Sequence, residues 1–105
     1  MKYISVNDIK ITIGSNQNDN DVLFDLAGDN DLWFHVNNLP SAHLWVKFTD
    51  FDKNTLYRIA LELKKNSKYK KYNNISVIYA PKSSLKKTNK LGCIQIVGKS
   101  KKIKV

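Results

Sequence analysis

Strict alternation of apolar side chains in two short segments near the middle of the chain constrains its fold more than any other feature. Residues 32–36 and 44–48 each place an apolar residue at every second position. Successive side chains of a β-strand point to opposite faces of the sheet, so the pattern predicts two strands that share one apolar face. The core residues predicted from this face are Leu32, Phe34, Val36, Leu44, Val46 and Phe48.

Further strands are predicted on both sides of this pair. Residues 3–14 alternate around Asn7-Asp8, which favours a β-hairpin with a two-residue turn. Residues 75–80 are rich in β-branched side chains, and we expect a strand there. The predicted strands of a closing hairpin are residues 94–97 and 103–105, which turn around Gly98-Lys99-Ser100.

Two segments carry apolar residues at helical spacing. Asp19 and Asp21 lie where the partial positive charge of a helix N-terminus favours acidic side chains, and Gly28 favours an end to this helix. Asn54 can cap a second helix. The two apolar stripes are Val22, Leu23, Leu26 and Ala27, then Leu56, Ile59, Ala60 and Leu63. Together the elements predict one α+β domain over residues 1–105, with a mostly antiparallel sheet and two helices.

Charge is distributed unevenly along the chain, whose formal net charge is +9. All nine acidic residues lie between Asp8 and Glu62, whereas Leu63 to Val105 holds thirteen lysines and no acid. Such segregation favours contact with a polyanion, of which nucleic acid is the commonest. A lysine-rich genome would explain why lysines replace arginines, but it would not explain why acidic residues stop at Glu62.

The composition argues against several other classes of protein. The single cysteine, Cys93, excludes a disulfide within the chain, and no apolar run approaches the roughly 18 residues that cross a bilayer. The N-terminus has no apolar signal stretch, so we expect a soluble, cytoplasmic protein. His35, His43 and Cys93 lack the spacing of a zinc site. We therefore expect no metal, no cofactor and no catalytic activity.

The faces of the two central strands that point away from the predicted core carry aromatic and polar side chains. If the strands pair antiparallel, Trp33 and His35 share a surface with His43 and Trp45. Aromatic faces are sequence-tolerant stacking platforms for nucleic-acid bases. The alternative is that these tryptophans are structural, because a tryptophan on a sheet often packs beneath a helix.

Several short motifs resemble the RNA-binding domain of NFACT proteins, and the resemblance covers nearly the whole chain. The motifs are Gly14-Ser15-Asn16, Asn20-Asp21-Val22-Leu23, Asp31-Leu32-Trp33-Phe34-His35, Pro40-Ser41-Ala42-His43, Tyr79, Leu85-Lys86-Lys87, Gly92 and Ile103-Lys104-Val105. The short eukaryotic type that contains a coiled coil is the variant most similar to this chain. Its corresponding turn also ends in Ser-Ala-His.

The resemblance implies a role in binding tRNA or ribosomal RNA, related to ribosome-associated quality control. It also places Asn16, Trp33, His35 and His43 among the expected RNA-contacting residues. The chain departs from the long members in having no N-terminal NFACT domain and no room for coiled-coil arms, so extension of stalled peptides by this chain alone is not expected. Ser15 stands where many members have a basic residue.

A basic loop supplies the remaining candidate contacts, because lysine side chains suit phosphate oxygens. The predicted phosphate-binding residues are Lys82, Lys86, Lys87 and Lys90. Lysines without base-reading arginines imply contact with backbone shape rather than with sequence. Three alternatives stay open: a solvated lysine surface without a specific ligand, a general polyanion or DNA binder, and a protein-interaction adaptor that uses the tryptophan strands.

Overall fold

The two central strands form and pair as their alternation predicts. In the computed structural model, which describes residues 1–105, β3 (Leu32–Val36) runs antiparallel to β4 (His43–Val46), with Trp33 opposite Trp45. The alternating apolar residues of both strands are buried on one face. Phe48 is an exception to the predicted core, because β4 ends at Val46 and the Phe48 side chain lies 56% exposed in the following loop.

The sheet containing these strands has six members in the order β1-β2-β4-β3-β5-β8, and every neighbouring pair is antiparallel. A second, two-stranded sheet pairs β6 with β7. The remaining elements are β1 (Lys2–Val6), β2 (Ile9–Gly14), α1 (Gln17–Leu26), α2 (Lys53–Lys65), β5 (Ser76–Pro81), the short 3-10 helix η1 (Lys82–Ser84), β6 (Leu85–Lys87), β7 (Ile94–Ile96) and β8 (Lys101–Lys104). The predicted α+β class is confirmed. No helix has the length and apolar character needed to cross a membrane.

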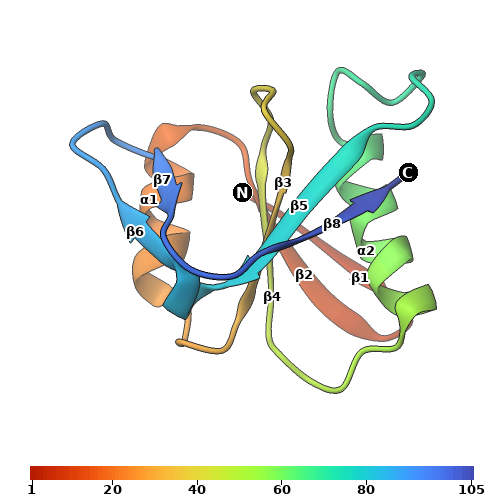
Figure 1. Ribbon diagram of the computed structural model, residues 1–105, viewed down its shortest axis with the longest axis horizontal. Helices are drawn as coiled ribbons and strands as arrows, with labels where there is room; N and C mark the ends of the chain where they lie inside the picture. The colour runs from red at the N-terminus through yellow and green to blue at the C-terminus, as the bar shows by residue number, and fades with distance from the viewer.

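Helices cover both faces of the large sheet, and Figure 1 shows α1 and α2 on opposite sides of it. The larger cluster lies between the sheet and α2, and Phe34 at its centre is completely buried. A smaller cluster lies between the sheet, α1 and the β6–β7 hairpin. Its six buried residues are Leu23, Trp33, Trp45, Ile78, Ala80 and Leu85. The chain thus has three layers, with the tryptophans in the smaller of two cores.

Both predicted helices form, but each begins earlier than expected. The first starts after Asn16, whose side-chain oxygen accepts a hydrogen bond from the Asp19 backbone N–H at 2.9 Å. The second is capped by Asp52 rather than Asn54, through a 2.7 Å bond from the Thr55 N–H. In both cases a side chain with an acceptor oxygen satisfies an otherwise unpaired helical N–H.

The buried faces of the helices agree with the predicted stripes only in part. In α2 the stripe is confirmed, since Ile59, Ala60 and Leu63 are buried. In α1 only Leu23 of the stripe is buried, and Leu26 is 75% exposed. The helix is rotated relative to the prediction, so that it places Phe24 edge-on against Trp45, with ring centroids 6.1 Å apart.

The prediction of the first hairpin is confirmed, and the prediction of a closing hairpin is wrong. β1 and β2 pair around Asn7 and Asp8, which both adopt positive φ, as a two-residue hairpin turn requires. The last two strands do not pair with each other. β7 pairs with β6, and β8 pairs with β5 at the edge of the large sheet. The segment that joins β7 to β8 crosses from one sheet to the other. Within it, Gly98 packs so closely against Ser84 that a Cβ would have no room.

Candidate nucleic-acid interface

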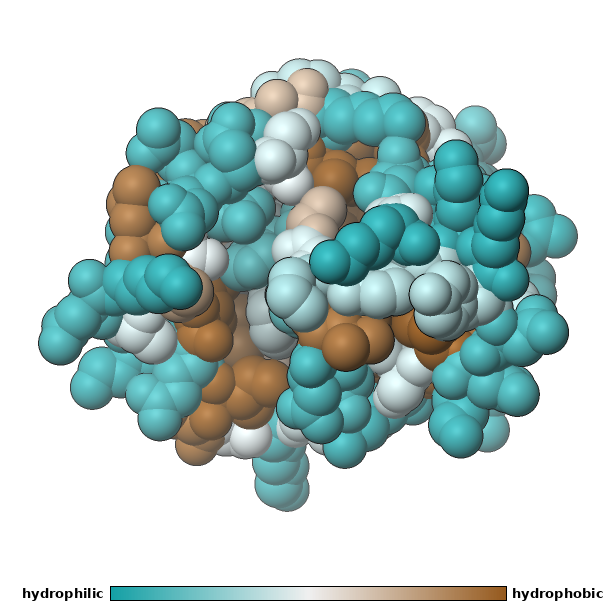
Figure 2. Space-filling view, turned by 90° about the horizontal axis from the view of Figure 1, so that it is seen from above, coloured by the Kyte–Doolittle hydropathy of each residue, from teal (hydrophilic) through white to brown (hydrophobic).

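Folding distributes the lysines of the second half over three places. They lie on the η1–β6–β7 segment, at the end of α2 with the loop that follows it, and on and before the edge strand β8. Figure 2 shows a face of the molecule on which hydrophilic residues dominate, with hydrophobic ones between them. The three groups differ in how many of their lysines are already paired within the protein.

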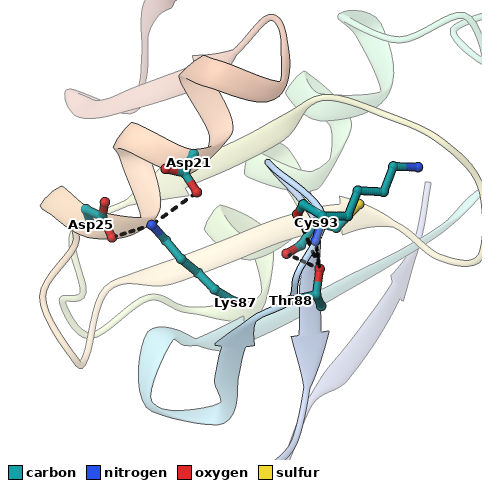
Figure 3. A network of polar contacts seen from close by, with 6 residues as sticks. Asp21, Asp25, Lys87, Thr88 and Cys93 are labelled. Atoms are coloured by element: carbon teal, nitrogen blue, oxygen red, sulfur yellow. Dashed lines mark hydrogen bonds and ion pairs between the residues drawn. The ribbon is translucent and has the colours of Figure 1, made fainter.

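Lys87 is the most strongly paired lysine of the predicted basic loop. Its Nζ lies 3.1 Å from Asp21 Oδ1 and 2.7 Å from Asp25 Oδ1, and Figure 3 shows it reaching from β6 to these two aspartates of α1. Hydrogen bonds to Asp25 and then to Asp21 raise the pKa of Lys87. The acidic first half of the chain therefore neutralises part of the basic second half, and it anchors the hairpin to α1.

Lys82 is also engaged within the protein. Its Nζ donates to the Ala27 carbonyl oxygen at 2.8 Å and lies 4.9 Å from the centroid of the Phe24 ring. A cation is favoured at this position because the C-terminal end of a helix carries a partial negative charge and an aromatic face attracts cations. Lys82 therefore stabilises the packing of η1 against α1.

Lys86 and Lys90 are the two predicted contacts that remain free. Both are exposed on the β6–β7 hairpin and neither forms an ion pair. Lys102 and Lys104, on the edge strand β8, are likewise exposed and without ion pairs. These β8 lysines are not among the contacts predicted from the sequence, although Lys104 belongs to a family-like motif and the acid-free, lysine-rich segment from Lys99 to Lys104 was a usable signal.

Trp33, His35 and His43 come together as the alternation predicted. The Trp33 ring stacks on His35 with centroids 5.4 Å apart, and His43 meets both rings edge-on at 5.6 Å and 5.0 Å. Trp33 is only 4% exposed and His43 only 6%, because α1 and the β6–β7 hairpin cover this face of the sheet. In this conformation the Trp33 ring is not accessible to solvent.

The environment keeps both histidines uncharged at neutral pH. Burial, and secondarily the neighbouring His35, lowers the pKa of His43 to about 3. Burial also lowers the pKa of His35, although a hydrogen bond with the Val36 backbone partly offsets it. The Trp–His cluster therefore carries no positive charge that could attract a phosphate, and the charge of any interface here comes from lysines.

Asn16, the remaining predicted contact, has a local structural role as the cap of α1. It lies on the exposed loop between β2 and α1, two residues after Gly14, which pairs with His43 in the sheet. No three His, Cys, Asp or Glu side chains gather in a way that could hold a metal ion. The predicted contacts thus fall into one buried neutral cluster, one exposed hairpin and one helix cap.

The sequence of this chain is similar to those of several known proteins. The sequence model of a family described as "NFACT protein RNA binding domain" matches residues 1–100. Coiled-coil domain-containing protein 25 from Bos taurus and from Mus musculus is 38% identical to this chain over 101 residues, which are 88% of this chain and 49% of each relative. A homologue from Dictyostelium discoideum is 31% identical over 83 residues, covering 72% of this chain and 40% of the relative. The chain thus spans about half the length of the first relatives it matches.

A solved structure has the same fold. The C-terminal part of the fibronectin/fibrinogen-binding protein from Streptococcus suis superposes with a TM-score of 0.86 at 25% sequence identity. The match covers 98% of this chain and 43% of that one. Nearly every element described above therefore has a counterpart in a protein whose sequence differs at most positions.

Proposed function

Because this chain belongs to the family of NFACT protein RNA-binding domains, we propose that it is a non-catalytic RNA-binding module that contacts tRNA or ribosomal RNA through its free lysines. The proposed setting is the cytoplasm, in a process related to ribosome-associated quality control. The observation that carries the proposal is the family match over residues 1–100, together with the acid-free lysine-bearing segments that follow Glu62.

The charge pattern supports particular lysines as contacts. Lys86 and Lys90 on the hairpin, and Lys102 and Lys104 on β8, have no carboxylate partner and can approach phosphate oxygens. Lys87 already has two aspartates, which compete with any phosphate. We therefore assign direct contact to the free lysines, and to Lys87 and Lys82 the positioning of the hairpin.

The buried aromatic cluster supports a framework role rather than a stacking role. A base could reach the Trp33 ring only if α1 or the β6–β7 hairpin moved away, because both cover it. His35 and His43 lie beside this ring and are uncharged at neutral pH. In the proposal these residues, with the helix cap Asn16, hold the surface in shape, and recognition is of backbone shape and charge.

A salt titration of RNA affinity tests the proposal. Each neutralised phosphate of a single strand lowers the slope of log K against log salt by roughly 0.7, so four to six contacts predict a slope of about −3 to −4. The double variant Lys86→Glu with Lys90→Glu should weaken binding to all RNAs similarly. Lys53→Glu, which changes an exposed lysine at the start of α2, is the control, and it alters the net charge by half as much as the double variant.

Three results would contradict the proposal or narrow it. Affinity for tRNA that does not change with salt would refute an interface built on lysines. Equal affinity for tRNA, DNA and heparin would indicate a general polyanion binder instead. If the double variant lowers log K by only twice as much as the Lys53 control, in proportion to the charge removed, then net charge rather than the hairpin governs binding.

An apolar groove favours a second candidate function, that of a protein-interaction adaptor. Exposed apolar side chains line it between β1, β2 and α1, among them Tyr3, Leu26 and Phe48. Contiguous exposed apolar surface often marks a protein-binding site. A partner captured by the wild-type chain after nuclease treatment, but lost in Leu26→Asp, would support the adaptor. Loss of every partner on nuclease treatment would refute it.

A further inference from the structure

A second pocket lies beside β5 of the large sheet. Its volume is about 900 Å³, within the range of roughly 300–1,000 Å³ that is usual for small-ligand sites. The loop between β4 and α2, the end of β5 and the segment before β8 form its walls. None of the residues predicted from the sequence as RNA contacts lies in it.

Aromatic rings form the walls of this pocket. Phe48 and Phe51 meet edge-on in the loop before α2, with centroids 6.5 Å apart. Tyr79 lines the pocket from β5 and is held in place because it stacks on the buried Phe34 at 5.1 Å. Phe48 is 56% exposed, so the ring is accessible to a ligand in the pocket. The walls therefore combine one fixed ring with one ring that is available for stacking.

The pocket is lined by two lysines, from β8 and the segment before it, and by two carboxylates, those of Asp50 and of the α2 cap Asp52. Lys101 is opposite Tyr79 in the ladder between β8 and β5, so the two side chains share a face of the sheet. Lys99 also lines the pocket, and neither lysine forms an ion pair. Asp50 supplies acceptor oxygens, which suit the exocyclic amino groups of adenine or cytosine.

We propose that this pocket, formed by Phe48, Phe51, Tyr79, Lys99 and Lys101, binds one unpaired base of an RNA. The base stacks on the exposed Phe48 ring, and the phosphates on either side of it lie against the two lysines. The placement of two lysines beside an exposed aromatic ring favours this occupant over an apolar side chain of a protein, because a nucleotide uses both the ring and the ammonium groups, whereas an apolar side chain uses only the ring. The inference rests on the proposed RNA binding and adds a preference for single-stranded segments, since paired bases do not expose their faces.

The test compares a stem-loop RNA that has adenines in its loop with a fully paired duplex of the same stem. The wild-type chain should bind the stem-loop more tightly than the duplex. Phe48→Ala should weaken stem-loop binding by roughly 5- to 150-fold, the range expected for one lost stacking contact, and should leave duplex binding unchanged. Tyr72→Ala is the matched control, because Tyr72 is similarly exposed, at 60%, and lies outside the pocket.

A 2-aminopurine base in the loop reports the contact directly. Its fluorescence should be quenched when the wild-type chain binds and should recover in Phe48→Ala. Circular dichroism checks that the variant is folded, and Lys101→Gln offers a second way to weaken the same site without changing an aromatic ring. We expect Lys101→Gln to reduce the preference for the stem-loop over the duplex.

The outcomes separate this inference from the proposed function. If the wild-type chain binds neither RNA, the proposed function itself fails. If it binds RNA with the expected salt dependence, but Phe48→Ala and Lys101→Gln keep the full stem-loop preference and the quenching, the base pocket is refuted and RNA binding stands. Spectral shifts of pocket residues on adding apolar peptides but not RNA would identify a protein site and would likewise overturn the inference.

Discussion

Acidification from pH 7 to pH 5 should destabilise the protein mainly through His43. Burial holds the pKa of this side chain at about 3, whereas the unperturbed value is 6.5. As the pH falls below 6.5 the unfolded chain binds a proton that the folded chain does not, so stability is lost between pH 6.5 and about 3. At about 1.36 kcal/mol per pKa unit, the loss between pH 7 and pH 5 is about 2 kcal/mol, to which His35 adds in the same direction.

The range from pH 7 to pH 5 isolates the histidines. Asp19 and Asp52 also have lowered pKa values, because each carboxylate accepts a backbone hydrogen bond, but the ordinary aspartate pKa of 3.8 places their effect at lower pH. Urea unfolding at several pH values, followed by tryptophan fluorescence, measures the change, since Trp33 and Trp45 are buried in the folded state. His43→Gln should flatten the dependence and leave only the part due to His35.

Two results would refute this reasoning. One is an unfolding free energy that stays constant between pH 7 and pH 5 in the wild-type chain, which would mean that His43 can be protonated without cost in the folded state. The other is an NMR titration in which the His43 ring changes protonation near pH 6.5 while the protein is folded. Either result would show that the cluster of His43, His35 and Trp33 admits a charge.

Two further predictions concern stability. Gly92→Ala should destabilise the fold by about 1–3 kcal/mol in thermal or urea unfolding, because the residue has a φ of +75° and a Cβ there would lie 2.8 Å from the Gln17 backbone. Gly28→Ala, whose Cβ would make only ordinary contacts, should be nearly neutral, and equal losses in the two variants would contradict this view. Asn16→Ala should cost about 1 kcal/mol through loss of the α1 cap, and Asn16→Ser should recover most of it. If RNA affinity measured well below the melting temperature falls in Asn16→Ser as well, then Asn16 contacts RNA in addition to capping the helix.

The fold class and the central strands could be predicted because their signals are local. The alternation of Leu32, Phe34 and Val36 fixes which side chains share a face, and pairing with β4 follows from a short connection. The pairing of β8 with β5 could not be predicted in this way, because it joins segments separated by the whole β6–β7 hairpin. Two apolar residues at alternating positions, Ile94 and Ile96, suit either neighbour equally well, so this segment gave no preference.

The candidate interface was harder to predict, because a sequence shows which residues are charged but does not show which of them form ion pairs in the folded protein. Lys87 and Lys86 are adjacent in the chain and equivalent by composition, yet only Lys87 meets the aspartates of α1. The rotation of α1 that brings Asp21 and Asp25 to the hairpin depends on the packing of Phe24 against Trp45, which no local pattern reveals. The Phe48 pocket was missed for a similar reason, since alternation predicted that side chain to be in the core.

The pairing of Lys87 with α1 has a consequence for how the molecule approaches another charged body. Asp21 and Asp25 of α1 offset the charge of Lys87, whereas the lysines of β8 on the edge of the sheet stay uncompensated. The protein therefore carries an electric dipole as well as a net charge. Near a polyanion this dipole exerts a torque that turns the β8 edge forward during diffusion, before any contact forms.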